Sequence, residues 1–205
     1  MQNFWDTFEG AYQMGVQPHR TYMLETLADH GVESLLDVGC GTGPIYELNR
    51  DLGYNFKYKG TDYAEGMIRV CKELFPDGDF EKQDMRKLTE PDNSWDCVLL
   101  LHALDHTDDY KAAIKEAARV AKRYVCIVLW RGFVDEGTNI STEQTYGLPE
   151  GLDQWPEKNH LQEYSMKVLT DAFAEAGLEV EETAEGEQLN GDYSHYNFLF
   201  LLHKT

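Results

Sequence analysis

The feature that most constrains the fold is a short apolar run followed at once by alternating glycines. Residues 34–43 read Ser-Leu-Leu-Asp-Val-Gly-Cys-Gly-Thr-Gly, and Pro44 comes next. The apolar run predicts a buried strand, glycine permits backbone angles closed to other residues, and proline suits the first turn of a helix. This order predicts a nucleotide-like ligand at the carboxyl end of a parallel strand. A tight turn without a ligand is the alternative.

The spacing of these glycines separates two kinds of cofactor. The dinucleotide fingerprint is G-x-G-x-x-G, whereas here Gly39, Gly41 and Gly43 alternate and Pro44 stands where the fingerprint needs another residue. Asp37 lies just ahead of the turn. Its charge repels a pyrophosphate but attracts an ammonium or sulfonium group. The turn therefore favours a cationic ligand over a dinucleotide.

The pattern D-x-G-x-G-x-G, which starts at Asp37, resembles motif I of the class I S-adenosylmethionine (SAM)-dependent methyltransferases. In that family the glycine turn packs against the methionine part of SAM, which implies cofactor contacts for Asp37, Gly39, Cys40 and Gly41. The resemblance covers residues 30–130 in motif detail and the whole chain in the order of its elements. It implies SAM as the methyl donor and S-adenosylhomocysteine as the product.

Strands and helices alternate from residue 18 onward, which predicts an α/β fold. A loop rather than a helix joins the last two strands, and this predicts an antiparallel hairpin because a parallel return needs a crossover. We expect one domain over residues 1–205, with a doubly wound, mostly parallel seven-stranded sheet whose last strand is antiparallel. The resemblance implies the same sheet. The expected strands span residues 34–38, 56–61, 79–83, 95–101, 124–130, 179–183 and 196–203, and the helices 18–30, 44–52, 64–75, 108–122 and 165–176.

Two acids at predicted strand ends are candidates for holding the nucleoside of the cofactor. Asp62 ends the second strand, where a carboxylate can accept hydrogen bonds from ribose hydroxyls; capping the next helix is its alternative role. In methyltransferases that this chain resembles, an acid at the position of Asp84 accepts a hydrogen bond from the adenine amino group, while the N–H of the next residue, here Met85, meets a ring nitrogen. Tyr63 and Met67 either cover the adenine face or belong to the ordinary core.

The fourth strand runs into an L-x-H segment that resembles the fourth motif of small-molecule methyltransferases. The resemblance places Leu101 and His102 at the SAM amino group and the transferred methyl. His102 and His106 are four residues apart, which leaves three roles open: a metal pair on a helical face next to Asp105, a general base, or rim residues of the pocket. For an acceptor that needs a base, His106 and His102 are the catalytic candidates, and we expect no metal.

Two further segments are candidates for covering the site. Residues 1–30 are expected to form a helical lid, as in similar enzymes, with Tyr12, His19 or Arg20 at the SAM carboxylate. An amphipathic helix packed on the sheet edge is the alternative. Residues 131–163 form the longest irregular stretch, and such loops in compact domains are usually functional. Because this stretch leaves the carboxyl edge of the sheet and is rich in aromatic residues, we expect it to hold the acceptor.

Composition narrows the choice of partner and compartment. The formal net charge is -19, from 37 acids against 18 bases, and such a surface repels a nucleic-acid backbone. The sequence shows no basic, apolar leader and no run of about 20 apolar residues, so we expect no membrane contact. The four cysteines form no C-x-x-C pair and are expected to be reduced thiols of a cytoplasmic protein.

These observations predict a SAM-dependent methyltransferase that acts on a small-molecule acceptor. Methyl transfer needs an in-line approach to the sulfonium methyl, and positioning supplies much of the rate, so no universal catalytic residue is required. One alternative is a non-catalytic SAM-binding protein with a regulatory or assembly role. A nicotinamide-dependent oxidoreductase is less consistent with the sequence, because it shares the fold type and Asp62 but needs a different glycine spacing.

Overall fold

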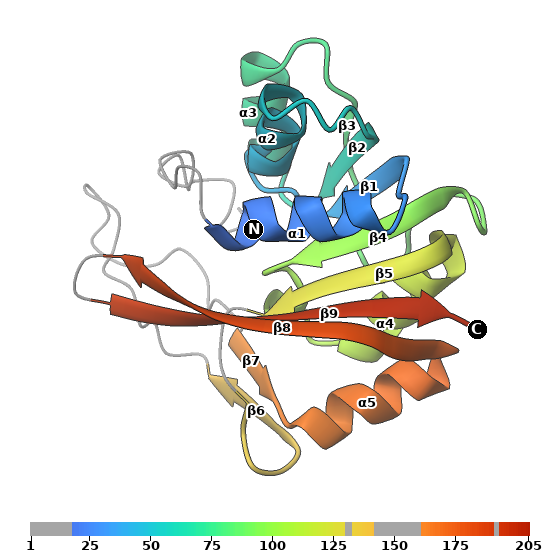
Figure 1. The fold of residues 1–205 in the computed structure, drawn as a ribbon, viewed down its shortest axis with the longest axis vertical. Helices are drawn as coiled ribbons and strands as arrows, with labels where there is room; N and C mark the ends of the chain where they lie inside the picture. The colour runs from blue at the N-terminus through green and yellow to red at the C-terminus, as the bar shows by residue number, and fades with distance from the viewer. Residues whose placement is uncertain (1–17, 130–132, 142–160, 191–192) are drawn as a thin grey trace.

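The computed structural model describes residues 18–129, 133–141, 161–190 and 193–205. Figure 1 shows a twisted sheet with helices packed around it. In chain order the elements are α1 (Pro18–Asp29), β1 (Ser34–Val38), α2 (Pro44–Asp51), β2 (Lys57–Asp62), α3 (Glu65–Leu74), β3 (Phe80–Lys82), β4 (Trp95–Leu101), the 3₁₀ turn η3 (Leu104–His106), α4 (Tyr110–Val120), β5 (Ala121–Leu129), β6 (Thr138–Ser141), β7 (Leu161–Tyr164), α5 (Met166–Glu175), β8 (Leu178–Asn190) and β9 (Tyr193–Lys204).

The main sheet has seven strands in the order β3-β2-β1-β4-β5-β9-β8. Neighbours from β3 to β5 pair in parallel, and β9 runs antiparallel to both β5 and β8. The predicted fold class is therefore confirmed, including the reversed last strand. The strand order changes direction between β1 and β4. In open α/β sheets, ligands bind outside the carboxyl ends of the strands at such a point.

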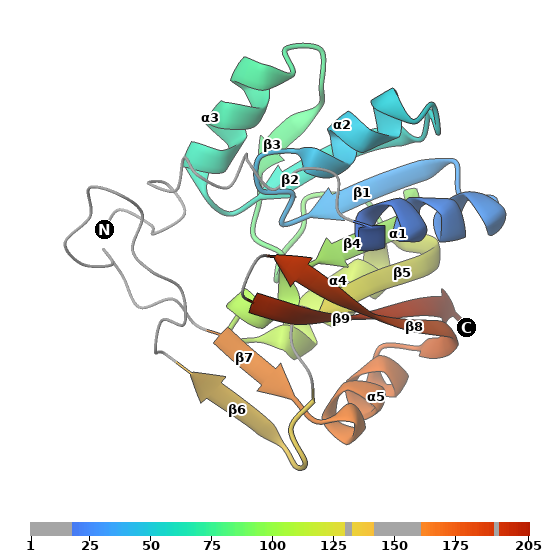
Figure 2. The same ribbon diagram turned by 60° about the vertical axis from the view of Figure 1, so that its left-hand side comes forward.

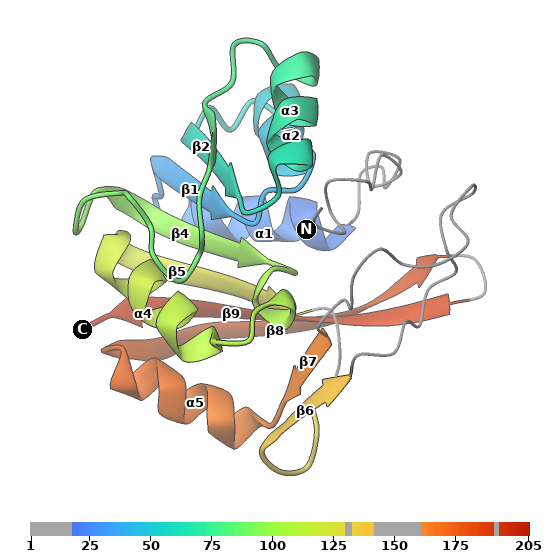
Figure 3. The same cartoon turned by 180° about the vertical axis from the view of Figure 1, so that it is seen from behind.

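Each face of the sheet has its own apolar core. Helices α1, α2 and α3 pack on one face, and α4 and α5 pack on the other, which Figure 3 shows from behind. Every residue of β1 is buried, as is all of β4 except the half-buried Asp96. Parallel strands covered on both faces have nearly continuous apolar sequences. This explains why the predicted bounds of these two strands are correct to the residue.

The junction of α4 and β5 differs from the sequence prediction. The helix ends at Val120 and the strand begins at Ala121, three residues earlier than expected. Ala121 pairs with Trp95 of β4, and this sheet pairing overrides the helix propensity of the local sequence. Trp130, predicted as the last residue of this strand, lies outside the described residues.

Residues 131–163 are not irregular throughout, contrary to expectation. Strand β6 lies within them, and β7 begins within them and ends at Tyr164; the two strands form an antiparallel ribbon, with Ser141 opposite Leu161 and Thr138 opposite Tyr164. Figure 2 shows this ribbon as a separate pair of strands beside the main sheet. Strands of four residues are too short to give a clear periodic signal in the sequence.

The last two strands are longer than predicted. They pair from Leu178 opposite Lys204 to Asn190 opposite Tyr193, whereas β5 pairs with β9 only as far as Leu129 opposite Phe198. The outer part of the hairpin therefore projects past the carboxyl end of β5, as Figure 1 shows. The sequence of this outer part is polar and did not indicate a longer strand, because apolar alternation is the main signal for a strand.

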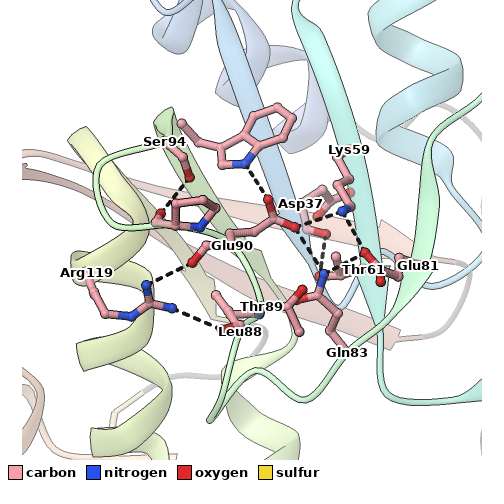
Figure 4. Close-up of polar contacts among 12 residues, drawn as sticks. Asp37, Lys59, Thr61, Glu81, Gln83, Leu88, Thr89, Glu90, Ser94 and Arg119 are labelled. Carbon is pink, nitrogen blue, oxygen red and sulfur yellow. Dashed lines mark hydrogen bonds and ion pairs between the residues drawn. The ribbon is translucent and has the colours of Figure 1, made fainter.

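A polar network fixes the connection between β3 and β4 against the sheet (Figure 4). The carboxylate of Glu90 accepts hydrogen bonds from the Lys59 ammonium at 2.8 Å, the Gln83 amide at 3.1 Å and the Trp95 indole N–H at 3.2 Å. The amide oxygen of Gln83 accepts the N–H of Thr89 at 2.9 Å. A buried network with many satisfied members holds a segment in one conformation.

We expect Glu90→Gln to lower the free energy of unfolding by about 2 kcal/mol at neutral pH, because hydrogen bonds to charged groups contribute roughly 1.5–3 kcal/mol. Burial acts to raise the pKa of Glu90, but the bonds from Lys59, Trp95 and Gln83 outweigh it and lower that pKa. A carboxylate of this kind stabilises the fold above its unfolded pKa and loses the effect as pH falls through the folded value. The loss should therefore shrink below pH 4.5, the ordinary value for this group.

Urea unfolding at several pH values measures this difference. Glu73→Gln is the matched control, because Glu73 lies exposed on α3. Equal losses of stability in the two variants would show that the network contributes nothing.

Candidate functional site

The glycine turn leaves β1 in the predicted geometry. Gly39, Gly41 and Gly43 have φ angles of 82°, 56° and 84°, a region that glycine enters without steric cost. The N–H groups of Gly39 and Cys40 donate to the carbonyl oxygen of Thr61 at 2.7 and 2.9 Å. These two hydrogen bonds fix the glycine turn to the end of β2. Helix α2 begins directly after the turn.

Two glycines of the turn have different surroundings. A Cβ at Gly39 would lie 2.5 Å from the Cβ of Ala103, so this position is closed to side chains by packing. A Cβ at Gly41 would meet no atom of the described residues within 4 Å. The main chain at Gly41 therefore borders open space at the carboxyl edge of β1, where a ligand can approach.

Asp62 joins the glycine turn to the start of α3. One carboxylate oxygen accepts the N–H of Gly41 at 3.0 Å, and the other accepts the N–H of Ala64 at 2.8 Å. Ala64 is the N-cap of α3 and makes no side-chain cap bond of its own. Asp62 thus has a structural role close to the helix cap considered above. Because a carboxylate can accept about four hydrogen bonds, this role is compatible with binding ribose hydroxyls.

Asp37 is a buried acid behind the turn. One of its oxygens accepts the hydroxyl of Tyr58 at 2.6 Å, and the other has no hydrogen-bond partner among the described residues. Burial raises the pKa of Asp37 to about 7, the charge of Asp62 adds to this, and the Tyr58 bond and the charge of Arg20 oppose it. A cation placed beside Asp37 would favour its ionised form.

Helix α1 brings two basic side chains to the same edge. Arg20 is buried, which lowers its pKa, and the charge of Asp37 partly offsets that effect. The His19 ring lies with its centroid 5.1 Å from that of His102. Burial and the charge of Arg20 lower the pKa of His19 to about 4, so its imidazole is neutral. Tyr12 lies outside the described residues, and the lid over residues 1–30 stays a prediction.

Of the two candidate catalytic histidines, His102 precedes a single 3₁₀ turn and His106 ends it. His102 follows Leu101 at the end of β4, has a φ of 53°, and donates its N–H to the Val128 carbonyl at 2.8 Å. His106 is the last residue of η3. The backbone of His102 is in the left-handed region and the turn is short, so the two histidines do not share a helical face. The metal alternative depended on such a shared face. The described part of the chain holds no cluster of metal-binding side chains.

The carboxylate of Asp84 is held by a neighbouring arginine. The Arg86 guanidinium donates to both oxygens, with Nη2 to Oδ2 at 2.8 Å, and also reaches Asp108 at 2.7 Å. The Arg86 bond lowers the pKa of Asp84 and keeps it ionised. Met85 packs against the apolar core. An adenine amino group at Asp84 would share the carboxylate with Arg86, and both assignments stay predictions.

The remaining predicted cofactor residues have different environments. Tyr63 is 55% exposed, whereas Met67 is 2% exposed and lies in the interior. Leu101 is buried at the end of β4. A hydrogen bond with Cys71 and burial raise the pKa of the Cys40 thiol well above its usual range, so Cys40 contributes to the turn through its main chain.

Three residues that shape the turn were not predicted from the sequence, namely Tyr58, Thr61 and Cys71. The thiol of Cys71 donates to the Gly41 carbonyl at 3.1 Å. Their roles depend on the parallel register that sets Asp37 opposite Gly60, and single-sequence patterns do not encode this register. One usable signal was the polar-tipped Tyr58 in a predicted strand, because a buried tyrosine hydroxyl usually finds a partner.

Comparisons with known proteins agree with the sequence and the fold. Residues 36–128 match the family described as "Methyltransferase domain". The demethylmenaquinone methyltransferase of Paenarthrobacter aurescens is 27% identical over 161 residues, which cover 68% of this chain and 61% of that protein. The demethylmenaquinone methyltransferase of Staphylococcus aureus strain MRSA252 is 33% identical over 113 residues, covering 52% and 47%. The chain thus matches about half to three fifths of the length of these relatives.

Solved structures show the same fold. The magnesium protoporphyrin IX methyltransferase of Synechocystis PCC 6803, crystallised with bound SAM, superposes with a TM-score of 0.62 at 16% identity. The match covers 91% of this chain and 78% of that chain. At this level of identity the likeness concerns the fold.

We expect Gly41→Ala to weaken SAM binding by at least about tenfold and Gly53→Ala to leave it unchanged. Both glycines have positive φ, 56° and 75°, and in the part of the chain that the structure describes no atom lies within 4 Å of a Cβ built at either. The strain of a left-handed alanine, about 1–2 kcal/mol, is therefore common to both variants. If calorimetric titration shows that SAM affinity falls in Gly41→Ala but not in Gly53→Ala, SAM lies against Gly41. Wild-type affinity in a folded Gly41→Ala protein would refute the motif I assignment.

We expect SAM binding to be coupled to ionisation of Asp37. Because burial raises the pKa of Asp37 to about 7, cation binding at lower pH must expel a proton. Calorimetry at about pH 6, in buffers of different ionisation enthalpy, should report about one proton released per SAM bound. Affinity should rise with pH up to that pKa.

Asp37→Asn is the matched control for this proton release. A folded pKa above the unfolded value means that ionising Asp37 costs stability as pH rises between the two. Asp37→Asn should therefore melt at a higher temperature than wild type above pH 7, and should lose the proton release. The same release in both proteins would assign the proton to another group.

Proposed function

Because this chain belongs to the class I SAM-dependent methyltransferases, we propose that it transfers a methyl group from SAM to a small-molecule acceptor and releases S-adenosylhomocysteine. The observation that carries the proposal is the positive-φ glycine turn at the carboxyl end of β1, with Gly41 open on its outer side and Asp62 bound beneath it. In the proposed complex the methionine part of SAM lies along Gly39–Gly41 and the ribose hydroxyls meet Asp62.

The charges at this edge suit a zwitterionic, sulfonium-bearing ligand. Asp37 is the buried acid that we assign to the cationic groups of SAM, and Arg20 is a buried cation for its carboxylate. Asp84, Met85 and Tyr63 are the proposed adenine contacts. Pairing charges in a poorly solvated site makes each interaction stronger than it is in water.

The chemistry that follows is a displacement at carbon. A lone pair of the acceptor attacks the methyl carbon, the carbon–sulfur bond breaks, and sulfur keeps the electron pair as a neutral thioether. A protic nucleophile must also lose a proton, and His106 or His102 at the end of β4 is the proposed base. His19 is neutral, and it can accept a hydrogen bond from the acceptor or from His102.

We propose an uncharged aromatic acceptor of the quinone type, in its reduced hydroxyl form because a methyl cation equivalent needs an electron-rich partner. Two relatives are named demethylmenaquinone methyltransferases. Aromatic rings gather where β9 passes the end of β5: Phe133 lies 4.9 Å from Phe198 and 6.1 Å from Phe200 between centroids. The net charge of -19 disfavours anionic acceptors.

Titration with SAM, S-adenosylhomocysteine and NAD separates the candidate functions. Methyl transfer requires binding of the first two and label transfer from methyl-labelled SAM to a menadiol-type hydroquinone or to a compound in a metabolite extract. SAM binding without turnover on either pool would favour the non-catalytic alternative. Binding of NAD in place of SAM would overturn the proposal.

We call residues 131–163, which we expect to hold the acceptor, the acceptor segment. A protein in which this segment is shortened should bind SAM and lose methyl transfer. Ser141 and Leu161 are opposite each other in the β6–β7 ribbon, so an Asn-Gly turn can replace residues 142–160 without breaking the ribbon. The proposed SAM contacts all lie before residue 107 in the chain. Full turnover in the folded, shortened protein would move the acceptor site to the N-terminal side.

The described helices include none that is long and apolar enough to cross a bilayer. The proposed acceptor class includes compounds of low solubility in water. The hydroquinone should be assayed both in detergent micelles and in aqueous solution. Absence of methyl transfer in both would contradict the proposed acceptor class.

A further inference from the structure

Tyr164, the last residue of β7, lies where the acceptor segment meets the turn that carries His106. Its hydroxyl donates to the carbonyl oxygen of Leu104 at 2.7 Å. Tyr164 is 1% exposed and Leu104 is fully buried. The ring of Tyr164 also packs edge-on against Tyr110 of α4, with centroids 5.1 Å apart. A buried hydroxyl in a short hydrogen bond fixes the relative position of its two segments.

The turn around η3 has weak main-chain support of its own. The N–H of His106 donates to the Ala103 carbonyl at 3.1 Å, and the N–H of Thr107 donates to the Leu104 carbonyl at 3.4 Å. The Thr107 distance is long for an N–H···O bond, and short 3₁₀ turns have poor hydrogen-bond geometry. The Tyr164 hydroxyl supports this turn from another segment of the chain.

The main chain of Tyr164 belongs to the base of the acceptor segment. Its carbonyl oxygen accepts the N–H of Val134 at 3.0 Å, and it pairs with Thr138 of β6. The next residue, Ser165, donates its N–H to the Gly137 carbonyl at 2.8 Å. One residue thus takes part in both the β6–β7 ribbon and the turn between the two candidate bases.

We propose that Tyr164 is a positioning residue that couples the β6–β7 ribbon to the turn at residues 102–106. Through the Leu104 carbonyl it sets the position of His106 relative to the end of β4. This inference rests on the proposed methyl transfer and adds to it a residue that positions the candidate base from another segment of the chain.

Tyr164→Phe tests the link, because it deletes the hydroxyl and keeps the ring. Tyr110→Phe is the matched control, since Tyr110 contributes the partner ring of the same stack. We expect Tyr164→Phe to keep SAM affinity within about twofold and to lower kcat about five- to tenfold, the loss for one hydrogen bond. The pH profile of kcat should shift, because His106 changes its surroundings. Tyr110→Phe should change neither quantity.

Hydrogen exchange gives a readout that does not require turnover. In Tyr164→Phe the amides of residues 103–107 should exchange faster than in Tyr110→Phe. Unchanged kcat and an unchanged pH profile in Tyr164→Phe would overturn the positioning role, whatever happens to its melting temperature. If wild type transfers no methyl group at all, the proposed function fails, and equal exchange in both variants would then overturn the coupling as well.

Discussion

The rest of the site depends on the hydrogen bonds that the carboxylate of Asp62 accepts from the main chain. This carboxylate accepts one main-chain N–H from the glycine turn and one from the start of α3. The turns after β1 and β2 are thereby fixed to each other, at the point where a parallel sheet leaves its carboxyl edge open to ligands. The main chain of β2 holds the same glycine turn through the Thr61 carbonyl. A rigid, preformed loop of this kind loses little conformational entropy when a ligand binds.

Charge is the second constraint on this edge. Burial disfavours ionisation of Asp37, and the charge of Asp62 adds to that cost. The hydroxyl of Tyr58 and the charge of Arg20 compensate part of it. A buried acid with such incomplete compensation is common at functional sites. A cation at the glycine turn would supply the missing compensation, which connects the electrostatics of the free protein to the proposed sulfonium cofactor.

Much of the fold was predictable because local and tertiary requirements agree. The buried strands β1 and β4 have continuous apolar sequences, and glycine and proline mark the start of α2, so these bounds come directly from the sequence. The ribbon of β6 and β7 and the outer half of the β8–β9 hairpin were not predictable, because their sequences lack apolar alternation. In the site, the motif residues are recognisable from spacing. The roles of Tyr58, Arg86 and Tyr164 depend on register and on contacts between distant segments, which spacing does not contain.

A crystal structure of the complex with S-adenosylhomocysteine tests the central claim most directly. The account predicts the ribose hydroxyls within hydrogen-bond distance of Asp62, with the bonds from Gly41 and Ala64 retained, and the homocysteine part along Gly39–Gly41. Density for the ligand at another part of the sheet, or a ribose that leaves Asp62 bound to the main chain alone, would contradict it.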